Sequence, residues 1–190
     1  MGRWKPDARG RLAAAAFALY REQGYEQTSG AQIAARAGMH ERSLFRLFGD
    51  KREVFFHGMA DVAAHLSELI RDAPGEASAI DMVEQAMAAQ CGQIQQNPAH
   101  ARLRAAVVAS NADLRERDLA KHEELGDAVG DALRLRGVDD VSARLAVGAG
   151  MVAFRVALAD WFSADQRTDL VDLFHDTMSR LADEVADRST

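Results

Sequence analysis

The sequence contains a single cysteine, Cys91, and three prolines among its 190 residues. One cysteine excludes a disulfide within the chain and is compatible with a reducing cytosol, so we expect a cytoplasmic protein. Prolines are scarce and runs of β-branched residues are short, whereas alanine is abundant. This composition favours helices throughout, and we therefore expect an all-α fold.

Long hydrophobic runs are also missing. No run approaches the roughly 20 apolar residues that a membrane span needs, so we expect no membrane partner. The apolar run Leu12–Tyr20 follows several basic residues and superficially resembles a signal peptide, but it is short and has no credible cleavage site. We interpret it as a helix that buries Leu12, Ala16 and Leu19.

Charge is distributed unevenly along the chain. Residues 1–52 contain ten lysines and arginines against five aspartates and glutamates, whereas residues 53–190 contain thirteen against twenty-four. The net charge of the whole chain is −6 at pH 7. A basic segment on an acidic protein is typical of a chain that presents one end to a polyanion such as DNA.

The stretch from residue 28 to residue 51 combines short amphipathic helical segments with tight turns. Ser29 and Gln32 have the spacing of a capping box, and Gly38 ends the first segment where a positive φ is tolerated. Cationic and hydroxyl residues begin the next short helix. Two short helices joined by a glycine-containing turn predict a helix-turn-helix that binds duplex DNA.

About nine helices are expected along the chain. The clearest interruption is Ala73–Gly75, and the helix before it is expected to run without a break from Asp50 to Asp72. The predicted helices cover about residues 7–23, 29–37, 41–47, 50–72, 76–96, 98–110, 113–136, 140–162 and 164–187.

The first fifty or so residues resemble the DNA-binding domain of the TetR family of bacterial transcriptional regulators. The residues that carry the resemblance are Phe17–Tyr20, Gly24–Tyr25, Thr28–Ser29, Ile33–Ala34, Ala37–Gly38, Leu44–Phe45, Phe48 and Lys51. The resemblance implies a three-helix DNA-binding domain in residues 1–50 and a helical ligand-binding and dimerisation bundle in residues 51–190. It also implies a homodimer that binds double-stranded operator DNA. The function expected from it is that of a ligand-responsive, sequence-specific regulator, a repressor that a small apolar effector releases from a palindromic operator.

The family pattern places DNA contacts at eight residues of this chain. Phosphate contacts are implied at Thr28, Ser43, Phe45 and Lys51, base contacts at His40, Glu41 and Arg42, and Arg46 completes the cationic set.

Four residues depart from that pattern. His40 stands where the family usually has a Ser or Thr helix cap, so the cap is weaker or made through the imidazole. Arg42 replaces a common glycine and is well placed to bind a guanine edge through two hydrogen bonds. Phe45 replaces a frequent tyrosine and lacks its hydroxyl. Gly30 replaces an apolar residue and should loosen its helix slightly.

The rest of the chain offers weaker signals for ligand binding. The segments LRERDLAKHEELGDAVGDALRLRG and VSARLAVGAGMVAFRVALADWF loosely resemble the carboxyl-terminal domain of a TetR subgroup associated with fatty-acyl-CoA-like ligands, which suggests an elongated apolar effector. The last two predicted helices have more apolar breadth than one neighbour in the chain would need, which favours dimerisation through them. Side chains that line an apolar pocket, or simply belong to the core, are expected at Met59, Met82, Met87, Met151, Phe154 and Trp161.

Two further patterns admit other chemistry. His57, Asp61 and His65 are four residues apart, and on one helix face they could hold a transition metal, although such a row is more often a solvated or pocket-lining stripe. Gly148–Ala153 matches a dinucleotide-binding fingerprint but lies inside a long helical pattern, so we interpret its small residues as a close approach between helices.

We predict no metal, no cofactor and no catalytic residue, and we do not expect an enzyme. Two alternatives stay open. One is a helical small-molecule-binding protein with a non-functional helix-turn-helix, and the other is a helical metalloprotein.

Overall fold

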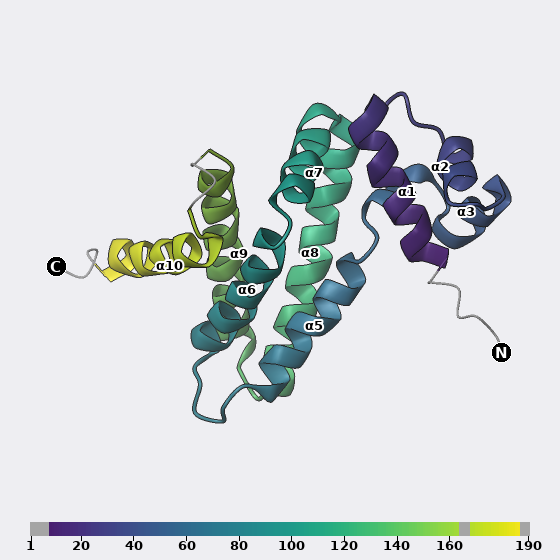
Figure 1. Cartoon of the computed structure of the whole chain (residues 1–190). Helices are drawn as coiled ribbons and strands as arrows, with labels where there is room; N and C mark the ends of the chain where they lie inside the picture. Colours follow the sequence, from purple (N-terminus) through teal and green to yellow (C-terminus); the bar gives the residue numbers. More distant parts are fainter. Residues whose placement is uncertain (1–7, 164–167, 187–190) are drawn as a thin grey trace, which may run out of the picture. The chain divides into compact units, whose positions relative to one another are not determined.

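In the computed structural model of the protein, residues 8–163 and 168–186 are described, and their regular elements are ten helices and no strand (Figure 1). The predicted all-α fold is therefore confirmed, with one helix more than expected. The helices are α1 (Ala8–Gln23), α2 (Gly30–Arg36), α3 (Glu41–Phe48), α4 (Lys51–Phe55), α5 (Met59–Asp72), α6 (Ala79–Gln95), α7 (Pro98–Ser110), α8 (Ala112–Leu135), α9 (Asp140–Ser163) and α10 (Leu170–Ala186).

Contacts between residues divide the described chain into two compact units. The amino-terminal unit comprises residues 8–59 together with residues 103–121, and the second unit comprises the other described residues. The boundary that we placed at residue 50 does not anticipate that residues 103–121 group with the amino-terminal helices. The limits of the DNA-binding and ligand-binding domains stay a prediction.

The amino-terminal unit is built around an apolar core of its own. Leu12, Ala16 and Leu19 of α1 are buried, as the interpretation of the first apolar run required. The rings of Tyr20, Tyr25 and Phe55 contact one another, with centroids 5.2–6.3 Å apart. Aromatic pairs at such distances contribute stability beyond their buried area. This core fixes α1, α4 and the turn between α1 and α2.

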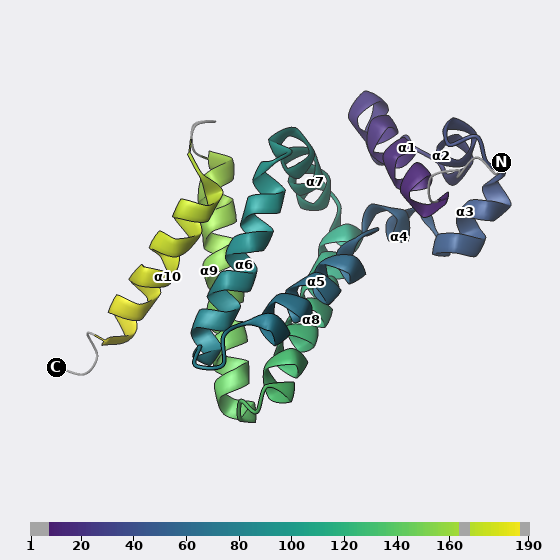
Figure 2. The same ribbon diagram turned by 60° about the horizontal axis from the view of Figure 1, so that its bottom comes forward.

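The second unit is centred on the packing of α6, α9 and α10, which lie side by side in Figure 2. Gly150 of α9 faces α6, and a Cβ atom added to it would overlap the buried side chain of Val83. The interpretation of Gly148–Ala153 as a close approach between helices is confirmed at Gly150, and the neighbouring helix there is α6 of the same chain.

The prediction of one uninterrupted helix from Asp50 to Asp72 is wrong. The helix ends after Phe55, and α5 begins at Met59, because Gly58 adopts a positive φ of 94° that interrupts the helical hydrogen bonds. Phe55 and Phe56, the last residue of α4 and the residue after it, are both buried in the core of the amino-terminal unit.

The break also separates the histidine row. His57 precedes Gly58 and packs edge-on against the ring of Phe48, whereas Asp61 and His65 lie on α5. The three side chains do not share the face of one continuous helix, as their spacing had suggested. In residues 8–163 and 168–186, no group of three or more His, Cys, Asp or Glu side chains could hold a metal ion.

Helix α9 is the one described helix that is long and apolar enough, by length and composition only, to cross a membrane. The expectation that no segment could span a membrane did not anticipate this helix, because polar and charged side chains interrupt its apolar residues. The signal is weak, since the core helix of a water-soluble protein passes the same test, and one face of α9 packs against α6 and α10.

Candidate nucleic-acid interface

Helix α2 begins with the predicted capping box. The Ser29 hydroxyl accepts a hydrogen bond from the backbone N–H of Gln32 at 3.2 Å, and the Gln32 side-chain oxygen accepts one from the Ser29 N–H at 2.8 Å. Such reciprocal bonds satisfy N–H groups that the first helical turn leaves without partners. At the other end of α2, Arg36 pairs with Glu22 of α1. Both ends of the helix are thus fixed within the amino-terminal unit.

The turn between α2 and α3 depends on Gly38. Its φ is 68°, in the left-handed region, and its N–H donates to the Ala35 carbonyl at 3.0 Å. The next residue, Met39, donates to the carbonyl of Ala34 at 2.8 Å. These bonds satisfy carbonyls at the end of α2 and turn the chain sharply towards α3. The predicted helix-turn-helix is present.

His40 precedes α3 as an extended residue, and its imidazole makes no capping hydrogen bond. Its backbone carbonyl accepts from the Ser43 N–H at 2.8 Å. Of the two possibilities that the sequence left open, the structure has the weaker cap. Glu41 in the first turn offsets this in part, because a carboxylate there interacts favourably with the helix dipole.

Helix α3 buries one face and exposes the other. Leu44 is fully buried, whereas Phe45 is half exposed and lies over the start of α2. A Cβ added to Gly30 would meet Phe45 at an ordinary van der Waals distance of 3.7 Å, so the glycine is not required for this packing. Exposed side chains at the start and along the outer face of α3 are His40, Glu41, Arg42, Phe45 and Arg46, with Ser43 half-buried beside them. Six of the eight predicted DNA contacts therefore lie together.

The cations of this region differ in their partners. Arg36 and Arg52 are neutralised, the first by Glu22 and the second by Asp50. Arg42 and Arg46 form no ion pair within the part of the chain that the structure describes. The outer face of α3 thus carries two guanidinium groups that form no ion pair within the described residues.

The two remaining predicted contacts, Thr28 and Lys51, lie elsewhere. Thr28 is almost completely buried, and its hydroxyl donates to the Gly24 carbonyl at 2.7 Å while accepting from the Gln23 side chain at 3.3 Å. A hydroxyl has a single proton to donate. A phosphate contact from Thr28 would therefore require its bond to Gly24 to break.

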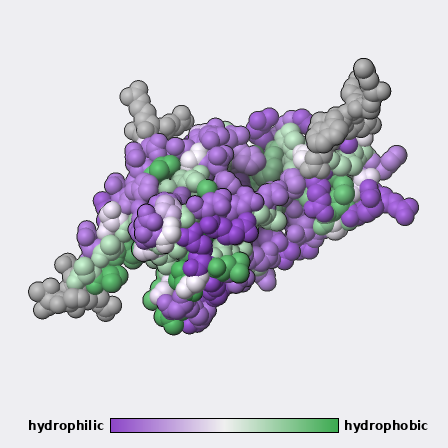
Figure 3. Space-filling model, turned by 90° about the horizontal axis from the view of Figure 1, so that it is seen from below, coloured by the Kyte–Doolittle hydropathy of each residue, from purple (hydrophilic) through white to green (hydrophobic). Residues whose placement is uncertain are grey.

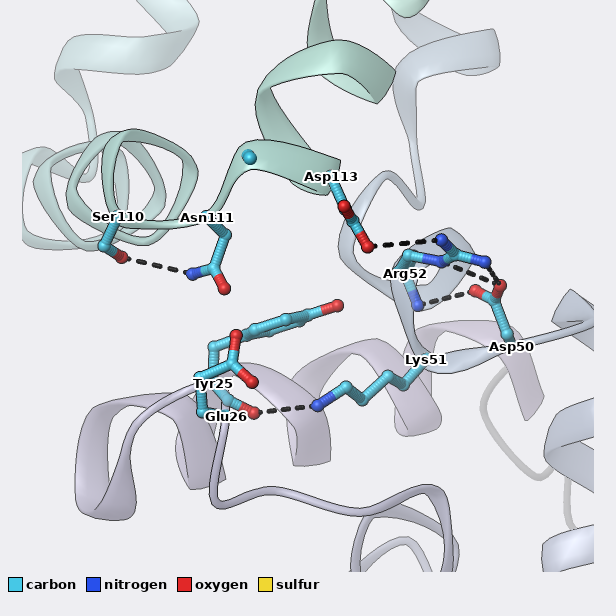
Figure 4. A pocket seen from close by; sticks show the side chains of 9 residues that line it. Tyr25, Glu26, Asp50, Lys51, Arg52, Ser110, Asn111 and Asp113 are labelled. Atoms are coloured by element: carbon cyan, nitrogen blue, oxygen red, sulfur yellow. Dashed lines mark hydrogen bonds and ion pairs between the residues drawn. The ribbon is translucent and has the colours of Figure 1, made fainter.

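Lys51 is half-buried, and its ammonium faces the turn between α1 and α2. The Nζ atom donates to the carbonyls of Tyr25 and Thr28, both at 3.1 Å, and lies 4.1 Å from the centre of the Tyr25 ring. Figure 4 shows this side chain at the wall of a hollow of about 490 Å³ within the amino-terminal unit. The hollow is lined by Tyr25, Glu26, Asp50, Lys51, Arg52, Ser110, Asn111, Ala112 and Asp113.

Two ionisable groups of this hollow are perturbed. Burial, together with the nearby carboxylate of Asp50, raises the pKa of the Tyr25 phenol to about 12, so this group is neutral at physiological pH. Partial burial opposes ionisation of Asp50, but hydrogen bonds from the Arg52 guanidinium and from the N–H groups of Arg52 and Glu53 outweigh it and lower the pKa. Asp50 caps α4 through those two N–H groups, at 2.7 and 3.1 Å.

The residues suggested for an effector pocket divide between the two units. Met59 belongs to the amino-terminal unit and packs against its core. The other five belong to the core of the second unit, where Met82, Met87, Phe154 and Trp161 are buried and Met151 is half-buried. The indole N–H of Trp161 donates to the Thr168 carbonyl at 3.0 Å. Met59 therefore does not lie with the rest of the set.

Comparison with known proteins gives three kinds of result. The family described as "Bacterial regulatory proteins, tetR family" matches residues 12–57, which include most of α1 and all of α2, α3 and α4. No curated protein matches the chain. Many solved structures share the fold, at identities that support no more than the fold.

Three of these structures illustrate the similarity. A putative TetR-family regulator from Syntrophomonas wolfei is 15% identical, with a TM-score of 0.71 over 92% of this chain and 94% of that one. FadR from Thermus thermophilus, a TetR-family repressor in complex with lauroyl-CoA, is 19% identical, with a TM-score of 0.62 over 92% and 93%. FadR from Bacillus subtilis, in complex with stearoyl-CoA, is 19% identical, with a TM-score of 0.61 over 90% and 95%.

The family match covers the helix-turn-helix and the helices on either side of it, in the region where the structure exposes an unpaired cationic face. The similarity in fold extends over 92% of the chain in two of these structures. Residues 12–57 thus match the tetR family of bacterial regulatory proteins, and the chain as a whole shares its fold with TetR-family regulators.

Proposed function

We propose that the protein is a homodimeric repressor that binds a palindromic operator and is released from it by a small, elongated, apolar effector. The observation that supports DNA reading most directly is the outer face of α3, with Arg42 and Arg46 exposed and without ion pairs in the described chain. A helix placed after a tight turn, with cations on its exposed face, fits the major groove. The protein would act in the cytoplasm, where its operator lies.

Arg42 is the residue that we expect to read a base. Arg42→Ala should weaken binding to the specific site by about 1–3 kcal/mol and leave binding to unrelated duplex DNA nearly unchanged, because a guanidinium on a guanine edge contributes to discrimination. Fluorescence anisotropy with DNA from upstream of the protein's own gene and with a scrambled duplex measures both affinities at two salt concentrations.

The matched control is Arg71→Ala, which removes an exposed arginine from α5 in the second unit and changes the net charge equally. It should leave both affinities as they are. Base reading by Arg42 is wrong if Arg42→Ala lowers the two affinities by the same factor.

The proposal for the effector rests on the second unit and on its structural relatives. The FadR proteins from Thermus thermophilus and Bacillus subtilis were solved with lauroyl-CoA and stearoyl-CoA. In this chain, Met82, Met87, Phe154 and Trp161 form part of a continuous apolar core between α6, α9 and α10. Methionine side chains are unbranched and flexible, so they adapt to an apolar chain more easily than branched aliphatic ones. We therefore propose a ligand of the acyl-CoA class.

Trp161 offers a direct test of that ligand. The chain has two tryptophans, so Trp4→Phe leaves Trp161 as the sole indole fluorophore. Lauroyl-CoA or stearoyl-CoA should change its emission saturably and, over the same concentration range, lower operator affinity at least about tenfold, a coupling typical of allosteric effectors. Coenzyme A without an acyl chain is the control. An emission unchanged by either acyl-CoA would exclude this class of effector.

The dimer is proposed to form through the last two helices, α9 and α10. Four large apolar side chains of α9 are solvent-exposed by 41–69%: Val141, Leu145, Val152 and Val156. Their spacings of four, seven and four residues place them on one face of the helix. On the face of the molecule that Figure 3 shows, the hydrophobic areas are separate and small. Four large exposed apolar side chains on one face of α9 support the proposal that this face binds a partner. We call these four residues the α9 stripe.

A further inference from the structure

Among Arg42, Arg46 and Lys51, the lysines and arginines predicted to contact DNA, Lys51 is the one whose charged group is hydrogen-bonded to the protein's own backbone in the described residues. Its ammonium donates to two backbone carbonyls, those of Tyr25 and Thr28, and lies against the face of the Tyr25 ring. A lysine ammonium has three N–H donors, so these bonds use two of them. Hydrogen bonds from a charged donor are about twice as strong as those between neutral groups. An approaching phosphate would have to compete with both.

The two carbonyls belong to the turn that leads into α2. Thr28 is followed directly by Ser29, the residue that caps α2. The Thr28 hydroxyl holds the Gly24 carbonyl, so the turn is fixed from inside as well as from Lys51. The position of the first residue of α2 therefore depends on where the Lys51 ammonium holds the turn.

Two hydrogen bonds of Lys51 connect α4 with α1 and with the turn that follows α1. The Tyr20 hydroxyl, on α1, donates to the backbone carbonyl of Lys51 at 3.4 Å, while the Lys51 side chain reaches the turn that follows α1. Asp50, directly before Lys51, caps α4 with its side chain. Lys51 thus joins the first turn of α4 to the segment between α1 and α2, and both ends of the link are anchored.

We infer that Lys51 is a positioning residue: its ammonium locks the turn between α1 and α2 and thereby sets α2, and the α3 that packs on it, in the orientation that reads DNA. This role replaces the phosphate contact that the family resemblance implies for Lys51, and it rests on the DNA-binding function proposed above. The lysine acts on DNA through the helices that it holds and adds no ionic contact of its own.

The salt dependence of DNA binding separates the two roles. Each phosphate that a cationic side chain neutralises adds about 0.9 to the slope of log affinity against log salt concentration. Lys51→Met keeps the aliphatic stem and removes the ammonium. With a 30-base-pair duplex of arbitrary sequence and no requirement for an operator, we expect the slope of this variant to equal that of the wild-type protein.

Hydrogen exchange provides a second readout that needs no DNA. Loss of two charge-assisted bonds to the turn should make the amides of residues 28–33 exchange at least about tenfold faster in Lys51→Met, while the amides of α6 keep their rates. The matched control is Arg46→Met, which removes the same charge from the exposed face of α3. It should lower the salt slope by about 0.9 and leave exchange in residues 28–33 unchanged.

Either of two results overturns the inference. One is a salt slope that falls by about 0.9 in Lys51→Met, which would identify an ordinary phosphate contact. The other is unchanged exchange in residues 28–33, which would show that the ammonium does not hold the turn. If the wild-type protein binds no duplex at any salt concentration, the proposed function fails, and the exchange measurement still decides the role of Lys51.

Discussion

Gly150→Ala is expected to lower the free energy of unfolding by about 1–3 kcal/mol, although alanine is the better helix former. The added methyl group would overlap the side chain of Val83, which is buried. Met87 lies on the same side, 3.7 Å from the added atom. Well-packed cores accommodate an extra carbon only by forcing side chains from their rotamers or by moving helices apart. Urea unfolding at one fixed protein concentration measures the change.

Gly92→Ala is the control for this substitution. Gly92 also lies inside a helix of the second unit, but a Cβ there would be 3.9 Å from Val171, an ordinary contact. This variant should gain about 0.5–1 kcal/mol from the lower conformational entropy of its unfolded chain. If Gly150→Ala is as stable as the wild-type protein, α9 does not pack on α6 as closely as the structure has it.

Features that depend on neighbouring residues in the sequence were predicted well. The capping box of Ser29 and Gln32 is present, and Gly38 adopts the positive φ expected of the residue that ends the first helix of the motif. These devices need only a few adjacent residues, because a helix end is satisfied by groups one turn away. The position of the helix-turn-helix could therefore be predicted without knowledge of the rest of the fold.

Features that depend on distant residues could not be predicted. Arg136, directly after α8, donates to the carbonyls of Ile70, Arg71, Ala73 and Pro74 at 2.6–3.1 Å and so caps α5. Nothing near Arg136 in the sequence indicates this contact. Gly58 presents the same difficulty. A glycine inside a helical pattern costs only about 1 kcal/mol, so local sequence does not distinguish a tolerated glycine from a break.

The candidate site shows the same division. The pattern placed Arg42 and Arg46 on one helix, four residues apart, and helical geometry alone was enough to predict that they are neighbours. Lys51 was predicted as a DNA contact on equal terms, yet its ammonium faces carbonyls more than twenty residues earlier in the chain. Spacing places a residue on an element but does not say whether its charge is already satisfied by another part of the fold.

The α9 stripe leads to the prediction with the largest expected effect. In a dimer with a two-fold axis, the same surface patch is used on both subunits, so one substitution acts twice. Val152→Glu places a carboxylate in the middle of the stripe, where Val152 is 41% exposed in the single chain. Burying unpaired charges at the interface should raise the dissociation constant of the dimer at least about 100-fold. Sedimentation equilibrium over a range of protein concentrations measures this change.

Gln93→Glu adds the same charge at an exposed position of α6 and should leave the dimer intact. Loss of the dimer should also weaken operator binding, because the dimer joins the two α3 helices that contact DNA. A dimer binds the second half-site as an intramolecular step, so a monomer loses that gain in affinity while each α3 keeps its own contacts. Val152→Glu should therefore bind the full operator no more tightly than an isolated half-site, whereas Gln93→Glu keeps the preference for the full operator. A monomeric Val152→Glu variant that still prefers the full operator would show that two joined DNA-binding units are not needed. A variant that stays dimeric would show that the stripe is not the interface.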